Sequence, residues 1–203
     1  KQIELPAFVR SCGTYAAFSG VIEKLGLKKL LEKHFGPERA KEMLTISHYM
    51  VLRGKVMYYF PYCADEYVPF VGKRITCAAI SRLFRGVTGN DRICFFNDWI
   101  KQRKSREYLA YDVTSISSYG KNMENLEWGY NRDKEKLPQI NMGMYFGEES
   151  RLPLYYRVYP GSIPDKAHLK YMVEDNEVIS SQRTRFVMDR GFYSAENMRY
   201  LVQ

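Results

Sequence analysis

The sequence predicts a mixed α/β (α+β) fold, in which a helical N-terminal region comes before a sheet with flanking helices. Up to about residue 107, apolar residues recur at a spacing of three to four, which is typical of amphipathic helices. From residue 108 onward, short β-branched and aromatic runs are bounded by turn residues, which is typical of strands. The predicted order of elements in this second part is β, ββ, α, β, α, without an internal repeat.

In the first part, the predicted helices cover residues 14–36, 37–60, 76–87 and 90–107, with a loop at 61–73. Gly36 and Pro37 separate the first two helices, because glycine and proline disfavour a continuous helix. Pro61 is expected to end the second helix, and Thr76 to cap the third. We interpret the apolar stripes of these helices as core rather than as a cofactor surface.

In the second part, the predicted strands cover residues 108–117, 140–148, 152–161 and 183–189, and the predicted helices 166–179 and 194–203. The acidic turn at 148–151 joins the second and third strands into a hairpin. Ser194 is the expected N-cap of the last helix, with Asn197 three residues further on.

The net charge of +8 is concentrated in the first part of the chain. Residues 1–107 hold 19 Lys and Arg against 10 Asp and Glu, whereas residues 108–203 hold 12 against 13. A basic region favours a polyanionic partner, nucleic acid first, although a solvated basic face has the same composition. The cluster Lys101, Arg103, Lys104 and Arg106 could contact DNA phosphates, or could complement the dipole at the end of a helix.

Several classes of protein are disfavoured by the sequence. The four cysteines form no C-x-x-C pair, which indicates reduced thiols in a cytoplasmic protein. The three histidines match no H-E-x-x-H pattern, so a zinc site is not expected. No signal peptide is visible, and no apolar run of about 18 residues predicts a membrane span.

Two acids interrupt apolar strands. Asp112 lies inside the first predicted strand, and Asp189 ends the last one. A strand that buries both faces tolerates an ionised carboxylate only if it is paired. An Asp at a strand end can also cap a turn or pair with an Arg, and Arg190 follows Asp189. These ordinary explanations stay open.

Three antiparallel strands, a helix and a fourth strand beside the first are the opening of an RNase H-like sheet. In that arrangement Asp112 and Asp189 lie side by side, and their like charges repel unless a cation holds them. Mg²⁺ prefers carboxylate oxygens and keeps part of its shell for water and phosphate. Two such ions, about 3.5–4 Å apart, support cleavage of a phosphodiester bond.

Three segments carry a resemblance to a known family: "YDVTSISSYG" (111–120), the stretch at 137–165 that ends in "PGSIPD", and "FVMDRGFYSAENMRYL" (186–201). In this order they contain D-x-T-S, G-x-x-x-D and D-R-G-F-Y-S. Together they resemble the DDE transposases of bacterial insertion sequences, in the branch with a β-rich insertion between the second and third catalytic acids. The likeness spans roughly residues 75–203.

The resemblance implies an endonuclease and strand-transfer activity. Members of the family bind the terminal inverted repeats of their element, cleave its ends and join them to target DNA. Asp112 and Asp189 match the first two catalytic acids, which hold Mg²⁺, with Mn²⁺ as a substitute. Thr114, Gly191 and Tyr193 would support the site, Gly191 by allowing a tight turn, and Arg190 would meet a DNA phosphate. Family members act as homodimers on paired ends. The resemblance also implies a cytoplasmic, nucleoid-associated protein that has no membrane partner.

Two positions depart from the family pattern. Ser162 stands where the family usually carries Asn, and no Glu fits the third catalytic acid before the sequence ends at Gln203. The expectation is therefore a transposase fragment, with a basic DNA-binding or support region at 1–107 and an RNase H-like domain at 108–203 that is incomplete at its C-terminus. Such a fragment is expected to be weakly active or inactive. The alternatives are an inactive DNA-binding remnant and another RNase H-like nuclease or resolvase.

Overall fold

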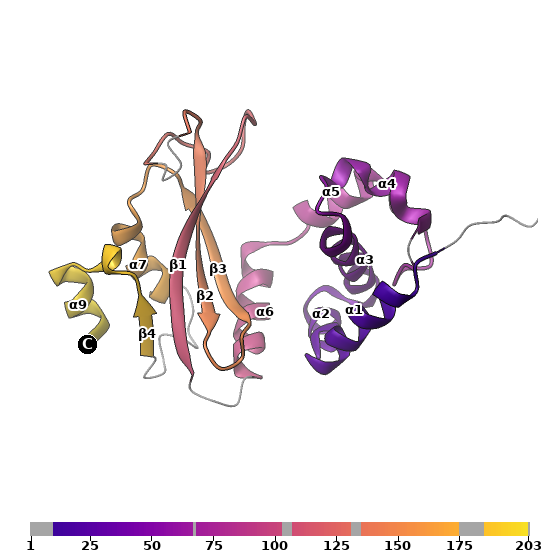
Figure 1. Cartoon of the computed structure of the whole chain (residues 1–203), viewed down its shortest axis with the longest axis horizontal. Coiled ribbons are helices and arrows are strands. Elements are labelled where there is room, and N and C mark those ends of the chain that lie inside the picture. The colour runs from indigo at the N-terminus through magenta and orange to yellow at the C-terminus, as the bar shows by residue number, and fades with distance from the viewer. Residues whose placement is uncertain (1–9, 67, 103–106, 131–134, 175–184, 203) are drawn as a thin grey trace, which may run out of the picture. The chain divides into compact units, whose positions relative to one another are not determined.

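The structure is a computed structural model that describes residues 10–66, 68–102, 107–130, 135–174 and 185–202. The chain divides into two compact units, Lys1–Phe95 and Phe96–Gln203, which we call the helical unit and the sheet unit (Figure 1). The division predicted from charge and periodicity, 1–107 and 108–203, concerns function and stays a prediction. No helix in the described ranges is long and apolar enough to cross a membrane.

The helical unit is built from short helices around one apolar cluster. Its elements are α1 (Gly13–Lys24), α2 (Leu27–Phe35), α3 (Pro37–Arg53), η1 (Met57–Tyr59), α4 (Phe60–Cys63), η2 (Ala64–Glu66) and α5 (Cys77–Arg85), followed by the start of α6 (Gly89–Lys101). The cluster contains Ile46, Tyr49, Phe60, Val71, Ile75, Ile80 and Leu83. The predicted cap at Thr76 is confirmed, because its Oγ1 accepts a hydrogen bond from the Ala79 amide at 3.2 Å.

Two helix boundaries differ from the prediction, and glycine is the reason in both cases. The helix predicted at 14–36 is two helices, because Gly26 takes a left-handed conformation with φ +67°. The helix predicted to run to Pro61 ends at Arg53, because Gly54 takes φ +55° and closes it. Pro61 lies instead inside α4, near its start, where its missing N–H costs no helical hydrogen bond.

The sheet unit contains four strands in the order β3-β2-β1-β4. They are β1 (Tyr108–Ser117), β2 (Gln139–Gly147), β3 (Pro153–Pro160) and β4 (Arg185–Met188). The β2–β3 hairpin is antiparallel, β1 is antiparallel to β2, and β4 is parallel to β1. This confirms the predicted mixed fold, with the fourth strand beside the first, as in an RNase H-like sheet.

Helices lie on both sides of this sheet (Figure 1). The helices α7 (Asp165–Glu174) and α9 (Ala195–Val202), with the short η3 (Arg190–Phe192) before α9, lie on one side. On the other side, α6 packs against β3. The Trp99 indole N–H donates to the Pro153 carbonyl at 3.0 Å, and the Phe96 ring meets Tyr156 edge-on.

The face under α7 and η3 is the core of the sheet unit. Tyr111 of β1 and Tyr145 of β2 are opposite each other in the register and are both buried. Burial raises the pKa of both tyrosines well above the ordinary value, so their hydroxyls stay protonated. Gly143 leaves room for the Tyr111 side chain, because a Cβ there would come within 2.8 Å of the Tyr111 hydroxyl.

Candidate active site

Asp112 is exposed, which corrects the expectation of a carboxylate buried inside a strand. Strand residues alternate between faces, so Leu109 and Tyr111 turn into the core while Asp112 and Thr114 turn away from it. The described helices leave this face of β1 exposed. The Asp112 Oδ1 accepts a hydrogen bond from the Val113 amide at 2.8 Å. Asp112 is exposed because one face of β1 is covered and the other is not.

Asp189 directly follows β4 and is also exposed. In the parallel pairing of β1 with β4, Tyr111 is opposite Met188, and this is the last pair of the register. Asp112 and Asp189 therefore occupy the next positions of two neighbouring strands. Adjacent strands lie about 4.8 Å apart, so the backbones at the ends of this register are close to each other. A common site for the two acids stays a prediction.

Asp112 lies on the exposed face of β1, on the side of the sheet opposite the Tyr111 core. Asp189 follows β4 with an extended backbone (φ −63°, ψ 152°). It lines an open pocket beside β4 together with Phe186 and Phe192.

An aromatic contact holds the two acid-bearing segments together. Phe192 is buried, and its ring lies 4.9 Å from the Tyr111 ring, between centroids. Tyr111 directly precedes Asp112, and Phe192 lies three residues after Asp189. The carbonyl of Asp189 accepts a hydrogen bond from the Phe192 amide at 3.0 Å, which closes η3. Phe192, the Phe of D-R-G-F-Y-S, therefore anchors the turn after Asp189 to β1.

Asn197 fixes the same turn from α9, and the sequence analysis assigned it no role. Its side-chain amide donates to the Phe192 carbonyl at 2.9 Å and to the Lys166 carbonyl at 3.1 Å. Its backbone amide donates to the Ser194 hydroxyl at 3.0 Å, which confirms the predicted N-cap. Its position at N3 of the capped helix was visible in the sequence, but its reach to Lys166 was not.

The supporting residues are all on the surface. Thr114 is exposed on the same face as Asp112, two positions further along β1. Arg190 and Tyr193 are exposed and, with Asp189, line an open pocket beside β4. Gly191 lies in the expected turn, but its φ is not positive and no atom lies within 4 Å of a Cβ built on it. The turn therefore does not require glycine.

The predicted basic cluster is only partly visible. Lys101 is exposed in the last turn of α6, where a cation complements the helix dipole. Arg103, Lys104 and Arg106 lie outside the described residues. Both the phosphate-binding and the dipole interpretation of this cluster stay predictions.

The "PGSIPD" loop is held by close backbone contacts. A Cβ on Gly161 would overlap the carbonyl oxygen of Gln139, so no other residue fits there without a shift. Ser162 donates a hydrogen bond to Glu127, which shows how this chain uses a Ser in the position where Asn was expected. Asp165 begins α7 and accepts a hydrogen bond from the Tyr159 hydroxyl at 2.8 Å.

The donor set suits a hard cation. Two exposed carboxylates on adjacent strand positions offer the oxygen ligands that Mg²⁺ prefers, and leave room for water and phosphate. Among the residues that the structure describes, no group of three or more His, Cys, Asp or Glu could hold a metal ion. The role of Asp112 and Asp189 as ligands of a shared ion stays a prediction.

Comparisons with known proteins assign the second part of the chain to a family. The family model described as "Transposase DDE domain" matches residues 103–203. Among solved structures, "Mos1 transposase paired-end complex with left transposon end" matches at 12% identity and a TM-score of 0.33. The match covers 100% of this chain and 59% of that one. The comparison with curated proteins gives no match. Residues 103–203 of this chain belong to the transposase DDE domain family.

Proposed function

We propose that this chain is the part of a DDE transposase that carries the first two catalytic acids, and that it acts on the DNA ends of an insertion sequence. The observation that supports the proposal is the β1–β4 register, because its last pair, Tyr111 and Met188, directly precedes the exposed Asp112 and Asp189. The complete enzyme would cleave the terminal inverted repeats and transfer the strands to target DNA as a homodimer on paired ends.

Asp112 and Asp189 would hold the divalent ion, Mg²⁺ or Mn²⁺. When bound, the ion supplies Lewis-acid activation of a water or hydroxyl and charge stabilisation at the leaving oxygen. The carboxylates fix its position because β1 and β4 are hydrogen-bonded to each other, and the Tyr111–Phe192 contact holds the turn after Asp189.

Other side chains would bind the DNA backbone. Arg190 directly follows Asp189 and is exposed, so its guanidinium can pair with the phosphate next to the scissile bond. Tyr193 is 68% exposed, and its hydroxyl can donate to a second phosphate oxygen. Lys101 adds positive charge, and its attraction to DNA weakens as the salt concentration rises.

Two acids are fewer than the three that the family uses. Two carboxylates would hold an ion loosely, so we expect this chain alone to nick DNA weakly or not at all. The alternative of a DNA-binding remnant predicts the same weak cleavage but no metal binding at Asp112 and Asp189. The alternative of another RNase H-like nuclease is disfavoured by the transposase family match.

The test is metal-dependent nicking of supercoiled plasmid with Mn²⁺ and Mg²⁺, together with calorimetric titration of Mn²⁺ into the protein. Wild type is expected to bind Mn²⁺, and Asp112→Asn and Asp189→Asn to abolish both binding and any nicking. Glu149→Gln, which removes an exposed acid from the β2–β3 turn, is the matched control. If both Asp variants bound Mn²⁺ as wild type does, the proposed site would be wrong.

A further inference from the structure

The segment between α3 and α5 exposes three tyrosines of the helical unit. Tyr58, Tyr59 and Tyr62, which we call the tyrosine patch, are 64%, 51% and 72% exposed. The Tyr58 ring lies 5.5 Å from that of Tyr59 and 6.1 Å from that of Tyr62, between centroids. A hydrogen bond with Tyr58 raises the pKa of Tyr62. A cluster of three exposed aromatic rings is typical of an interaction site, because burial against a partner would stabilise each ring.

The patch is held in place by the core beneath it. Phe60 lies between Tyr59 and Tyr62 in the sequence but is buried, and its ring meets Tyr49 edge-on at 5.2 Å. The Tyr58 carbonyl accepts a hydrogen bond from Cys77 Sγ at 3.7 Å. Arg74 donates to the Pro61 carbonyl at 3.0 Å. The exposed rings therefore stand on a fixed backbone, which lowers the entropy cost of binding a partner.

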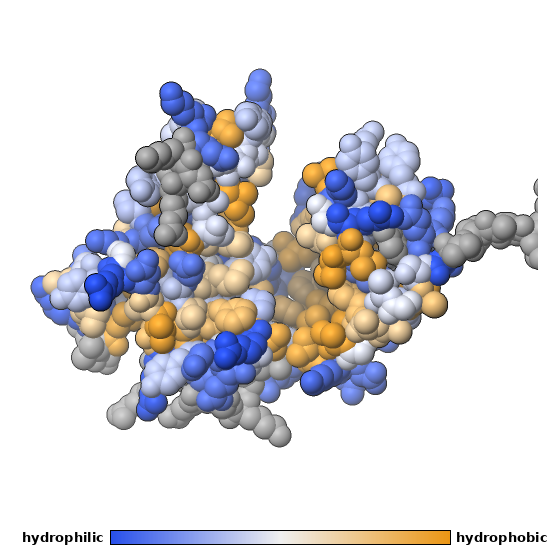
Figure 2. Space-filling view, viewed as in Figure 1, coloured by the Kyte–Doolittle hydropathy of each residue, from blue (hydrophilic) through white to orange (hydrophobic). Residues whose placement is uncertain are grey.

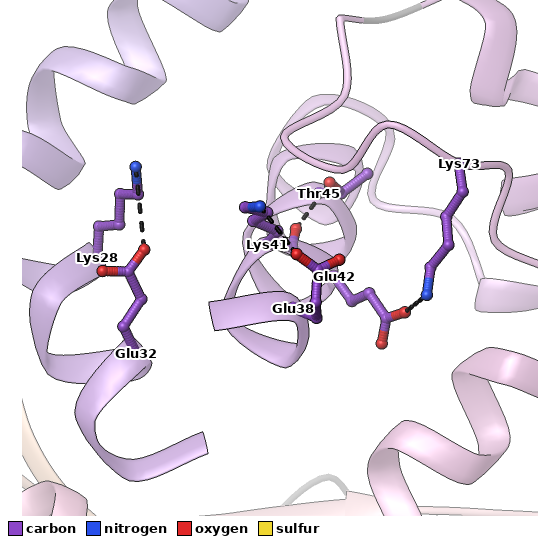
Figure 3. A network of polar contacts seen from close by, with 7 residues as sticks. All are labelled: Lys28, Glu32, Glu38, Lys41, Glu42, Thr45 and Lys73. Carbon is purple, nitrogen blue, oxygen red and sulfur yellow. Dashed lines mark hydrogen bonds and ion pairs between the residues drawn. The ribbon is translucent and has the colours of Figure 1, made fainter. Parts of the chain in front are cut away.

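Elsewhere on this unit, three lysines pair with glutamates. Figure 3 shows one pair within α2, one within α3 and one between α3 and Lys73 on the loop before α5. The pairs are Lys28–Glu32 at 3.9 Å, Lys41–Glu38 at 2.9 Å and Lys73–Glu42 at 2.8 Å. The unpaired positive charge of this unit is therefore not spread evenly over its surface.

The border of the tyrosine patch keeps its positive charge. Lys55 precedes the patch by three residues, and Arg74 lies against Pro61; neither forms an ion pair with another described residue. On the acidic side, Glu66 is paired with Arg53, and Asp65 is the remaining nearby carboxylate.

We propose that the tyrosine patch binds unpaired nucleotides of DNA. Exposed aromatic rings stack on bases that have left the double helix, and neighbouring cations contact the phosphates. In an intact duplex the bases are already stacked, so the rings would have no base to meet. The inference rests on the proposed function, because a base pair beside a cut in the strand opens more easily than one inside an intact duplex. Among partners, DNA fits better than a protein because cations border the rings.

The test is fluorescence anisotropy in EDTA with two labelled probes, a mixed-sequence single strand of about 16 nucleotides and a hairpin duplex. Tyr58→Ala/Tyr62→Ala is expected to weaken binding to the single strand by at least about tenfold, and binding to the duplex less than twofold. Tyr58→Phe/Tyr62→Phe keeps the rings and should retain binding. The matched control is Tyr119→Ala/Tyr130→Ala, which removes two tyrosines of the sheet unit that are each 87% exposed.

Unchanged binding to the single strand in the Ala variant would overturn the inference, and so would an equal loss for both probes. A change in sedimentation instead of DNA binding would assign the patch to contact between copies of the chain. Circular dichroism checks that each variant is folded. Because EDTA removes metal from the assay, failure of the Mn²⁺ experiment with Asp112→Asn and failure of this one are distinguishable.

Discussion

Gly161 and Gly191, each in an acid-bearing motif, differ in how closely other atoms surround them. A Cβ on Gly161 would overlap the carbonyl oxygen of Gln139 and come within 2.7 Å of the Glu127 carbonyl oxygen. A Cβ on Gly191 would meet no atom within 4 Å. Gly161 is therefore required by the fold, whereas the open space above Gly191 is on the exposed turn that follows Asp189.

We expect Gly161→Ala to lower the free energy of unfolding by about 2 kcal/mol or more, because backbone atoms cannot move aside cheaply. Gly191→Ala should change it by less than about 0.5 kcal/mol. Urea unfolding of both variants measures the difference. Equal losses at the two positions would show that the space around these glycines does not decide stability.

His168 gives the fold a pH dependence. Its ring is buried and stacks on Tyr159 with centroids 3.6 Å apart, and neither ring nitrogen has a hydrogen-bond partner among the described residues. Burial, helped by the charge of Arg157, lowers the pKa of His168 to about 4. The unfolded chain therefore binds a proton at a higher pH than the folded chain does, and acid favours unfolding.

The stabilising effect is complete above about pH 6.5 and is lost as the pH falls toward 4, at up to about 1.4 kcal/mol per pH unit. His168→Phe should flatten this part of the profile when urea unfolding is repeated across that range. Some slope will remain, because burial also lowers the pKa of His48. His34→Gln is the control and should keep the slope; an unchanged slope in His168→Phe would contradict the assignment.

At the scale of elements, the site depends on how β4, η3 and α9 are joined to β1. Four pairs of residues form the β1–β4 register, and beyond them the Tyr111–Phe192 contact and the Asn197 side chain hold the chain. Asn197 reaches the Phe192 carbonyl next to the site and the Lys166 carbonyl at the start of α7. It therefore links the turn after Asp189 to the helix that covers the core.

Asn197→Ala should lower the free energy of unfolding by about 1–3 kcal/mol, because two carbonyls lose their donor. It should also weaken Mn²⁺ binding, because the turn that positions Asp189 is released. Met198→Ala, at the exposed neighbouring position, is the control and should do neither. Urea unfolding and Mn²⁺ titration of both variants measure this. A variant that was destabilised but kept full Mn²⁺ affinity would limit Asn197 to a structural role.

Elements with a strong local pattern could be predicted from the sequence. The alternation in β1, the β2–β3 hairpin and the Thr76 and Ser194 caps depend on neighbouring residues, and the structure contains them. The helix ends at Gly26 and Gly54 could not be predicted reliably, because a glycine inside a periodic pattern is compatible with both continuation and termination.

The parallel pairing of the first and fourth strands could be predicted from the sequence, whereas the environment of the candidate site could not. The last pair of this register, Tyr111 and Met188, directly precedes Asp112 and Asp189, whose role stays a prediction. Exposure of Asp112 could not be predicted, because it depends on which face the helices cover. The anchoring by Phe192 and Asn197 depends on contacts between segments that are distant in the sequence, and no local pattern predicts such contacts.

For the whole molecule, the central claim is that Asp112 and Asp189 share a divalent ion. Thermal unfolding of the full chain with and without Mg²⁺ or Mn²⁺ tests it most directly. At about ten times the dissociation constant, the ion should raise the Tm of wild type and of Glu149→Gln by about 3–6 °C. Asp112→Asn and Asp189→Asn should show no shift, and without metal both should unfold at or above the wild-type Tm, because a like-charge repulsion is removed. The same metal-dependent shift in both Asp variants would contradict the account.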